Sequence, residues 1–222
     1  MDVLTRSALG FVVLAALLFV PAGTLAWPQA WIFLLLFLSG GGAIGLWLRR
    51  ADPDLLAERM KSPLSADQLP RDRAIMAAIL ACFAAWLASM GFDARFGWSH
   101  VPRSVQGVGA GLIVAAFWGW VRVLAVNSYA SATIRVQAER GQMVISRGPY
   151  AVVRHPMYAF ALIFLVGVAL LLGSFWGLVG LLALLPLLAA RVLGEEAVLE
   201  NGLPGYRAYA AKVRFRLLPW VW

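Results

Sequence analysis

The sequence predicts an all-α, polytopic membrane protein, because three of its properties exclude a soluble globular domain. Of 222 residues, 62% are hydrophobic and only 14% are charged, whereas soluble domains average about 45–50% apolar and about 25% charged residues. The mean hydropathy is +0.79. Apolar runs also recur along the chain, and about 20 such residues suffice for a helix to cross a bilayer. We therefore expect five to six transmembrane helices.

The apolar runs predict these helices in order. They cover residues 8–27, 29–48, 74–92 and 105–126, followed by a longer apolar region from 156 to 192. The last region is too long for one crossing, and Gly173-Ser174 marks a turn at its middle. It predicts a C-terminal helical hairpin of residues 156–172 and 175–192. The expected total is six crossings, or five crossings and one shallow segment.

Beyond the spans, the sequence shows no repeat and no separate soluble domain. We expect a single membrane domain over residues 1–222, with transmembrane helices in 1–126 and a more polar part in 127–222. The tail after Pro204-Gly205 has an amphipathic pattern, since Tyr206, Tyr209, Val213 and Leu217 would share one helical face. This tail helix is either an anchor on the cytoplasmic leaflet or a lid over a site at the membrane surface.

The net charge of +8 reflects the orientation of a membrane protein rather than a nucleic-acid partner. Basic residues gather in the loops 49–73 and 127–155 and in the tail, whereas the turns at 27–28 and 173–174 have none. The positive-inside rule then predicts that both termini and both large loops are cytoplasmic. Arginine greatly outnumbers lysine, which is typical of a GC-rich bacterial genome and indicates a bacterial inner membrane.

Polar residues that can carry chemistry gather in two segments near the predicted cytoplasmic face, 127–158 and 191–209. Pro156 suits the first position of a helix, where its missing N–H costs nothing. The free N–H groups of Met157 and Tyr158 at such a helix start would bind a carboxylate or a phosphate.

The second polar segment begins where the last span ends. Arg191 and Glu195 share a helix face, and an ordinary ion pair is the simplest explanation of the two residues taken alone. The adjacent carboxylates Glu195-Glu196, near His155, also suggest recognition of an ammonium group. We expect no metal site, because His100 and His155 lie in loops on opposite sides and Cys82 is the only cysteine.

Several of these residues form a longer pattern. It consists of Gly148-Pro149-Tyr150, Arg154-His155-Pro156-Met157-Tyr158, a helical hairpin, Arg191, Glu195-Glu196, Tyr206, Tyr209 and the basic end Arg216-Leu217-Leu218-Pro219. The pattern resembles the isoprenylcysteine carboxyl methyltransferase family, and the related membrane phospholipid methyltransferases share parts of it. The resemblance covers residues 125–219, whereas the N-terminal half adds only hydropathy.

This resemblance implies a membrane methyltransferase that uses S-adenosylmethionine, with a lipophilic acceptor entering from the bilayer. The first expectation is carboxyl O-methylation of an isoprenylcysteine-like group. Carried over to this chain, the residues that line the cofactor pocket would be Gln137, Gln142, Met143, Val144, Ile145, Tyr150, His155 and Tyr158. Glu195 would contact the cofactor and Arg191 the acceptor, so that residues 127–222 would form the cofactor-binding and catalytic part.

The chemistry of the acceptor decides which of these groups would be catalytic. A carboxylate acceptor needs no general base, so Arg191 need only orient it and balance its charge. An amine or thiol acceptor needs a base, for which His155, Tyr158 and Glu196 are the candidates. The sequence leaves the acceptor atom and the oligomeric state open.

Two alternatives to this function remain. The first, in the same chemical class, is N-methylation of a phospholipid ethanolamine head group or methylation of another small hydrophobic acceptor. The second is a non-catalytic membrane scaffold or a transporter. Transporters place ionisable groups near the middle of their spans, whereas the middles of these spans are almost free of charge. That difference argues against transport.

Overall fold

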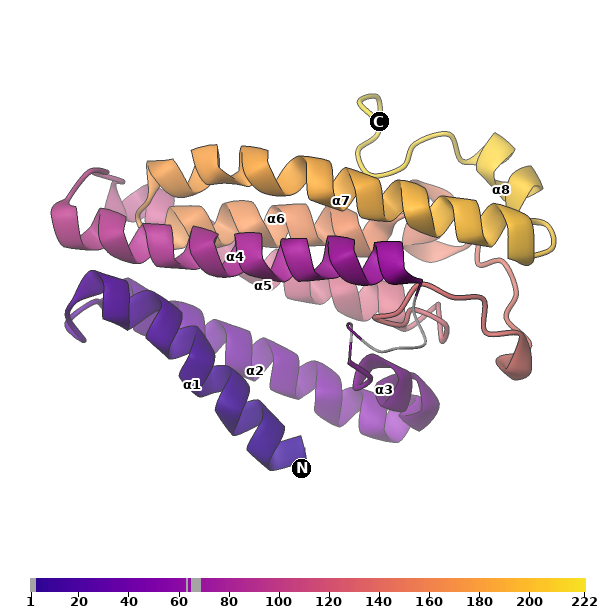
Figure 1. Cartoon of the computed structure of the whole chain (residues 1–222), viewed down its shortest axis with the longest axis horizontal. Helices are drawn as coiled ribbons and strands as arrows, with labels where there is room; N and C mark the ends of the chain where they lie inside the picture. The colour runs from indigo at the N-terminus through magenta and orange to yellow at the C-terminus, as the bar shows by residue number, and fades with distance from the viewer. Residues whose placement is uncertain (1–2, 63, 65–68) are drawn as a thin grey trace. The chain divides into compact units, whose positions relative to one another are not determined.

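The computed structural model describes residues 3–62, 64 and 69–222, with side chains from Leu9 onward, and within these ranges its regular structure is entirely helical (Figure 1). Residues 1–2, 63 and 65–68 of the predicted domain lie outside the description. Four helices are long and apolar enough to cross a membrane: α2 (Pro28–Ala51), α4 (Pro70–Phe96), α5 (Arg103–Leu124) and α7 (Phe175–Gly202). Two more helices have shorter apolar stretches: α1 (Val3–Ala22) and α6 (Pro156–Leu171). The prediction of an all-α, polytopic membrane protein is confirmed.

The C-terminal hairpin also forms as predicted, with one difference in length. Helix α6 ends at Leu171 and α7 begins at Phe175, and between them Gly173 has a φ of +81°, which a residue with a Cβ rarely adopts. Helix α7 continues to Gly202, although the hydropathy predicted an end at 192. The added residues are rich in Leu, Glu and Ala, which favour helix. The second polar segment therefore lies on the same helix up to Gly202.

Four short elements complete the secondary structure of the described residues. They are helix α3 (Pro53–Arg59), the 3-10 turns η1 (Ala138–Arg140) and η2 (Gly148–Ala151), and helix α8 (Tyr206–Lys212). The sequence did not predict α3, which begins with Pro53 at its first position. Its start is capped by Asp52, whose side chain accepts a hydrogen bond from the Leu55 N–H at 3.0 Å.

Helix α8 is shorter than the pattern of the tail indicated, and this part of the prediction was wrong. The backbone is already extended at Val213, so Val213 and Leu217 do not share a helical face with Tyr206 and Tyr209. The reason is a competing backbone pairing. The Arg154 N–H donates to the Phe215 carbonyl oxygen and the His155 N–H donates to the Arg216 carbonyl oxygen, each at 2.9 Å.

Contacts divide the chain into two compact units, each assembled from three stretches. Unit 1 comprises Met1–Ala43, Leu80–Phe117 and Ile163–Leu184, and unit 2 comprises Ile44–Ile79, Trp118–Leu162 and Leu185–Trp222. In unit 1, α5 and α6 approach so closely that a Cβ on Gly109 would lie 2.7 Å from the Gly167 carbonyl oxygen. Glycine at this position therefore permits contact between the two helix backbones.

Two apolar clusters in unit 2 hold the short helices against the long loop between α5 and α6, here called the α5–α6 loop (residues 125–155). The first has Leu48, Leu55 and Leu124 at its centre, with Ala130 and Met157 packed against it. It fixes α3. The second cluster fixes α8, and its members are Leu203, Tyr206 and Tyr209, with Val136, Val144, Tyr150, Leu199, Ala210 and Val213 around them.

Candidate active site

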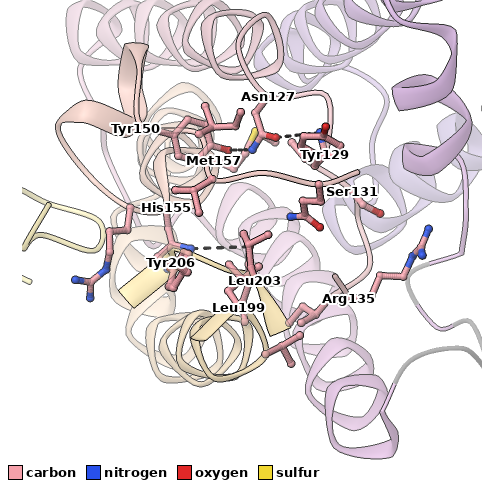
Figure 2. Close-up of a pocket in the computed structure, with 18 of the residues that line it drawn as sticks. Asn127, Tyr129, Ser131, Arg135, Tyr150, His155, Met157, Leu199, Leu203 and Tyr206 are labelled. Atoms are coloured by element: carbon pink, nitrogen blue, oxygen red, sulfur yellow. Dashed lines mark hydrogen bonds and ion pairs between the residues drawn. The ribbon is translucent and has the colours of Figure 1, made fainter. Parts of the chain in front are cut away.

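A pocket lies within unit 2, formed by the α5–α6 loop, the start of α6, the C-terminal part of α7 and α8 (Figure 2). Most of the side chains that the sequence predicted for a cofactor or acceptor site line it. They are Gln142, Met143, Val144, Ile145, Tyr150, His155, Tyr158, Arg191 and Glu195. These residues come from segments before and after the turn between α6 and α7, so the fold brings the two polar segments of the sequence together.

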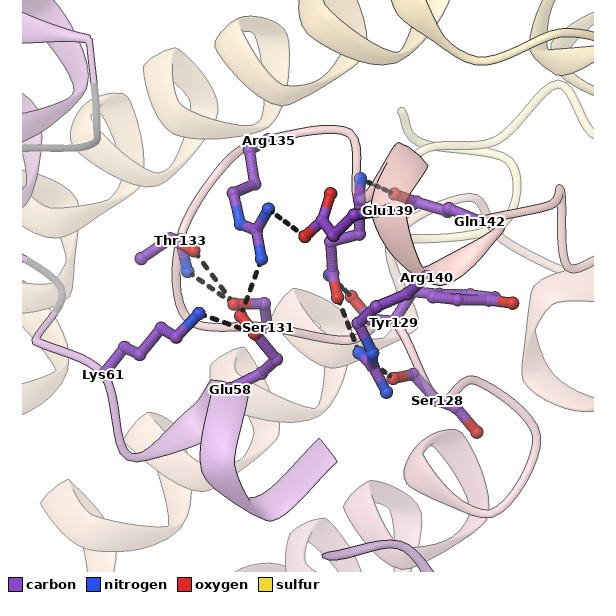
Figure 3. Close-up of polar contacts among 11 residues, drawn as sticks. Glu58, Lys61, Ser128, Tyr129, Ser131, Thr133, Arg135, Glu139, Arg140 and Gln142 are labelled. Carbon is purple, nitrogen blue, oxygen red and sulfur yellow. Dashed lines mark hydrogen bonds and ion pairs between the residues drawn. The ribbon is translucent and has the colours of Figure 1, made fainter. Parts of the chain in front are cut away.

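Gln137 was expected in the pocket but is not among the residues that line it. Its side chain is 1% exposed and is bonded within the loop. Its Nε2 donates to the Tyr129 carbonyl oxygen at 2.8 Å, and its Oε1 accepts a hydrogen bond from Arg140 Nη1 at 2.6 Å. The Gln137 N–H also donates to Gln142 Oε1 at 2.7 Å (Figure 3). Gln137 therefore supports the loop from behind the pocket.

Glu196 also lies outside the pocket lining and is 5% exposed. Its Oε1 accepts hydrogen bonds from Arg154 Nε at 2.7 Å and His155 Nε2 at 3.1 Å, and its Oε2 accepts one from Arg216 Nε at 2.7 Å. A carboxylate held by two guanidinium groups offers little as a proton acceptor for a substrate. Glu196 instead holds His155 and the C-terminal segment in place.

His155 lies directly before the first residue of α6, where the sequence predicted a helix start. Glu196 Oε1 can only accept in its hydrogen bond with His155 Nε2. The hydrogen-bond geometry therefore assigns the proton of the neutral ring to Nε2. The other ring nitrogen, Nδ1, lies 4.0 Å from Glu195 Oε1. The expectation of a free N–H group at Tyr158 was wrong, because this N–H donates to the His155 carbonyl oxygen at 3.1 Å.

Arg191 and Glu195 do not form the ordinary ion pair that their spacing allows, because each is bonded elsewhere. The Tyr158 hydroxyl donates to Glu195 Oε2 at 2.9 Å. Arg191 Nη2 donates to the Ala132 carbonyl oxygen at 2.7 Å. The second terminal nitrogen of Arg191, Nη1, is buried without a hydrogen-bond partner. Because an unpaired buried donor is costly, this nitrogen is well suited to bind an anionic ligand group.

Helix α8 contributes two buried tyrosines to the pocket. Tyr209 donates its hydroxyl to the Tyr150 carbonyl oxygen at 2.8 Å, whereas the Tyr206 hydroxyl is buried without a partner. Burial raises the pKa of Tyr209 to about 12 and the pKa of Tyr206 well above its usual range. Both phenols are therefore hydrogen-bond donors at neutral pH. Their place in the pocket lining favours the lid over the lipid anchor as the interpretation of the tail.

Other lining residues were not singled out by the sequence. They include Asn127, Tyr129, Ser131, Thr133 and Arg135, all from the start of the α5–α6 loop. Asn127 Nδ2 donates to the Tyr150 hydroxyl at 2.6 Å. The sequence marked this stretch as polar, but nothing in it distinguishes a pocket wall from a solvated loop. In the described part of the chain, no three His, Cys, Asp or Glu side chains gather in a way that could hold a metal ion.

Comparison with known proteins agrees with the resemblance seen in the sequence. Residues 105–203 match the model of the family described as phospholipid methyltransferase. This segment includes the α5–α6 loop, the α6–α7 hairpin and the lining residues from Asn127 to Leu203. No curated protein matches the chain. The predicted relationship is confirmed over this segment: residues 105–203 are similar to the phospholipid methyltransferase family of membrane methyltransferases.

Proposed function

We propose that the protein transfers a methyl group from S-adenosylmethionine to a lipophilic acceptor at the cytoplasmic face of a bacterial inner membrane. The acceptor group that the site favours is a carboxylate, as in an isoprenylcysteine. One observation carries this proposal: the buried Arg191 Nη1 has no hydrogen-bond partner in a pocket whose lining carboxylate, Glu195, already accepts from the Tyr158 hydroxyl through Oε2. An anionic acceptor would pair this donor.

The pocket residues fit the cofactor by their chemistry. Glu195, whose side chain is 29% exposed, offers a carboxylate for an ammonium group. The unpartnered Tyr206 hydroxyl offers a donor for a carboxylate. Val144, Ile145 and Leu203 supply apolar surface for a purine. When bound, S-adenosylmethionine supplies a methyl group activated by a sulfonium centre. Placement of the acceptor and exclusion of water are then the main tasks of the protein.

The hydrogen bonds around the pocket favour a carboxylate acceptor over an amine. Glu196 accepts from Arg154, His155 and Arg216, and the Tyr158 hydroxyl donates to Glu195. Both carboxylates are thus already hydrogen-bonded within the protein, and a carboxylate acceptor needs no base. Arg191 would hold the acceptor charge through Nη1 while Ala132 fixes its other terminal nitrogen.

The second candidate is methylation of an ethanolamine head group, which the name of the matched family suggests. The observation in its favour is the proximity of His155 Nδ1 to Glu195 Oε1, at 4.0 Å. A histidine that carries its proton on Nε2 presents Nδ1 as a hydrogen-bond acceptor. This pair would take up the proton that an ammonium acceptor must lose.

Calorimetric binding of S-adenosylmethionine and S-adenosylhomocysteine to the detergent-purified protein tests the cofactor assignment. We expect the wild type to bind both ligands and Glu195→Gln to bind them about tenfold or more weakly, because a hydrogen bond to a charged group is lost. Glu200→Gln is the matched control, since Glu200 is exposed on the same helix. Folded wild-type protein that binds neither ligand would support the scaffold alternative.

The acceptor is tested with a labelled methyl group and two classes of lipid. Arg191→Gln should keep its affinity for S-adenosylhomocysteine but lose most of its turnover of prenylated cysteine carboxylates. Under the second candidate, repeated methylation of an ethanolamine lipid should tolerate the same substitution. Labelling of ethanolamine lipid alone, undiminished in Arg191→Gln, would replace the carboxylate proposal with the amine one.

A further inference from the structure

One wall of the pocket is a stretch of the α5–α6 loop without regular secondary structure, residues 128–135. Buried backbone carbonyls in such a stretch need hydrogen-bond donors from elsewhere. Here side chains supply them: Arg140 Nη1 donates to Ser128 O at 2.9 Å, Gln137 Nε2 to Tyr129 O at 2.8 Å, Arg59 Nη1 to Ala130 O at 2.9 Å, and Arg191 Nη2 to Ala132 O at 2.7 Å. Only Arg59, among these four donors, lies outside residues 105–203.

Arg59 and its neighbour Glu58 contact this wall at two residues, Ala130 and Arg135. Arg59 binds the Ala130 carbonyl oxygen. Glu58 Oε2 accepts from Arg135 Nη2 at 3.1 Å, while its Oε1 accepts from Lys61 Nζ at 2.6 Å (Figure 3). Two consecutive residues of α3 therefore fix both ends of the stretch from Ala130 to Arg135. Figure 2 shows the Arg135 side chain directed away from His155 and Tyr206, although Arg135 belongs to the pocket lining.

Helix α3 is itself firmly placed, although it is only seven residues long. Leu55 is 0% exposed and packs with Leu48 and Leu124, and Ala130 and Met157 pack against the same cluster. Ala130 thus touches the cluster that anchors α3, while its carbonyl oxygen is bound by Arg59. An isolated helix of this length would be unstable in water, so α3 depends on this packing. Because the packing fixes α3, the hydrogen bonds from α3 fix the position of the wall.

We propose that Arg59 and Glu58 are positioning residues of the methyl-transfer site. They set the path of residues 130–135 and thereby the Ala132 carbonyl oxygen, which binds one terminal nitrogen of Arg191. Through this wall they determine where the second terminal nitrogen of Arg191 meets an anionic ligand group, and where the lining residues Ser131, Thr133 and Arg135 would face a bound cofactor. This inference rests on the proposed function, and it assigns a part of the site to helix α3, outside the matched segment.

Arg59→Met tests the proposal, because methionine keeps most of the apolar stem but has no donor. We expect amide hydrogen exchange of residues 130–135 to accelerate about tenfold and S-adenosylhomocysteine affinity to fall by a similar factor. Arg59→Lys, which retains a charged donor, should restore most of both. Arg50→Met is the matched control, since Arg50 is exposed near the end of α2. It should behave as the wild type does.

A variant that lowers stability elsewhere separates positioning from a general loss of structure. Gly109→Ala, in unit 1, should lower the thermal midpoint but leave ligand affinity unchanged. Wild-type exchange and affinity in Arg59→Met would overturn the proposal. If Arg59→Met does not fold, the test is the rate of amide hydrogen exchange near Arg135 in Glu58→Gln. An exchange rate there equal to that of the wild type would overturn the proposal. Wild-type protein that binds no S-adenosylhomocysteine contradicts the proposed function instead, while the exchange experiment still tests the positioning role.

Discussion

Arg216 Nε donates a hydrogen bond to Glu196 Oε2 at 2.7 Å, and this contact ties the C-terminal segment to α7. The same carboxylate binds Arg154 and His155 through its other oxygen. Because the backbone N–H groups of Arg154 and His155 also bind the C-terminal segment, the start of α6, the end of α7 and the tail meet at one point. Helix α8 is thus held between its connection to α7 and this junction.

Glu196→Ala should strongly destabilise the protein, because it leaves two guanidinium groups without their buried partner. Removal of one member of a buried ion pair costs about 3–5 kcal/mol, and we expect a decrease of this order in the free energy of unfolding. Denaturant unfolding in detergent, followed by tryptophan fluorescence, measures it. Glu200→Ala, on the exposed side of the same helix, should change stability little. Equal stability of the two variants would contradict this part of the structure.

Substitution of Gly109 should reveal the close contact between α5 and α6. A Cβ at this position would lie 2.7 Å from the Gly167 carbonyl oxygen, whereas nothing lies within 4 Å of a Cβ on Gly111. Gly109→Ala should therefore cost about 1–3 kcal/mol, while Gly111→Ala should be neutral or slightly stabilising, because alanine favours helix. Thermal midpoints of the two variants in the same detergent make the comparison. A loss in Gly111→Ala alone would show that the helices pack through a different face.

The anchoring of α3 should weaken in acid. The hydrogen bond from Lys61, together with Arg135, lowers the pKa of Glu58 from its usual 4.5. A carboxyl group with a lower pKa in the folded state adds stability above its unfolded pKa, and this contribution is lost as the pH falls through the folded pKa. The wild type should therefore be more stable than Glu58→Gln at pH 7, and the difference should shrink below pH 4.5. A constant difference from neutral to acidic pH would mean that Glu58 acts through packing alone.

Hydropathy was enough to predict the apolar helices, because the bilayer fixes their length and the need for internal backbone hydrogen bonds fixes their type. The turn at Gly173 followed from its residue types. Helix α3 escaped prediction because its stability comes from the Asp52 cap and the burial of Leu55, neither of which gives a strong local pattern. The length of α8 depends on a backbone pairing with a segment far away in the sequence.

The residues of the candidate site were predictable where they belong to the sequence motif. Tyr150, His155, Tyr158, Arg191 and Glu195 all line one pocket. The separate roles of Glu195 and Glu196 were not predictable, because neighbouring residues on a helix point about 100° apart and hydropathy does not fix the rotation of α7. The contact of Ala130 with Arg59 was not predictable either, because the two residues are far apart in the sequence.

The two tyrosines of α8 should respond differently to the loss of their hydroxyl groups. Tyr209→Phe removes the hydrogen bond to the Tyr150 carbonyl oxygen and should lower the free energy of unfolding by about 1 kcal/mol. Tyr206→Phe removes a buried hydroxyl that has no partner in the protein, so stability should stay equal or rise slightly. If that hydroxyl binds the cofactor, Tyr206→Phe should weaken S-adenosylhomocysteine binding several-fold.

Unfolding and calorimetry on the same preparations separate these two effects, because a donor reserved for a ligand affects binding without contributing to stability. The informative pattern is opposite in the two variants: lower stability in Tyr209→Phe, and lower affinity at unchanged stability in Tyr206→Phe. Wild-type affinity in Tyr206→Phe would leave its buried hydroxyl without a ligand, and α8 would then only cover the pocket. Lower stability in Tyr206→Phe would instead show that the hydroxyl has a partner within the protein.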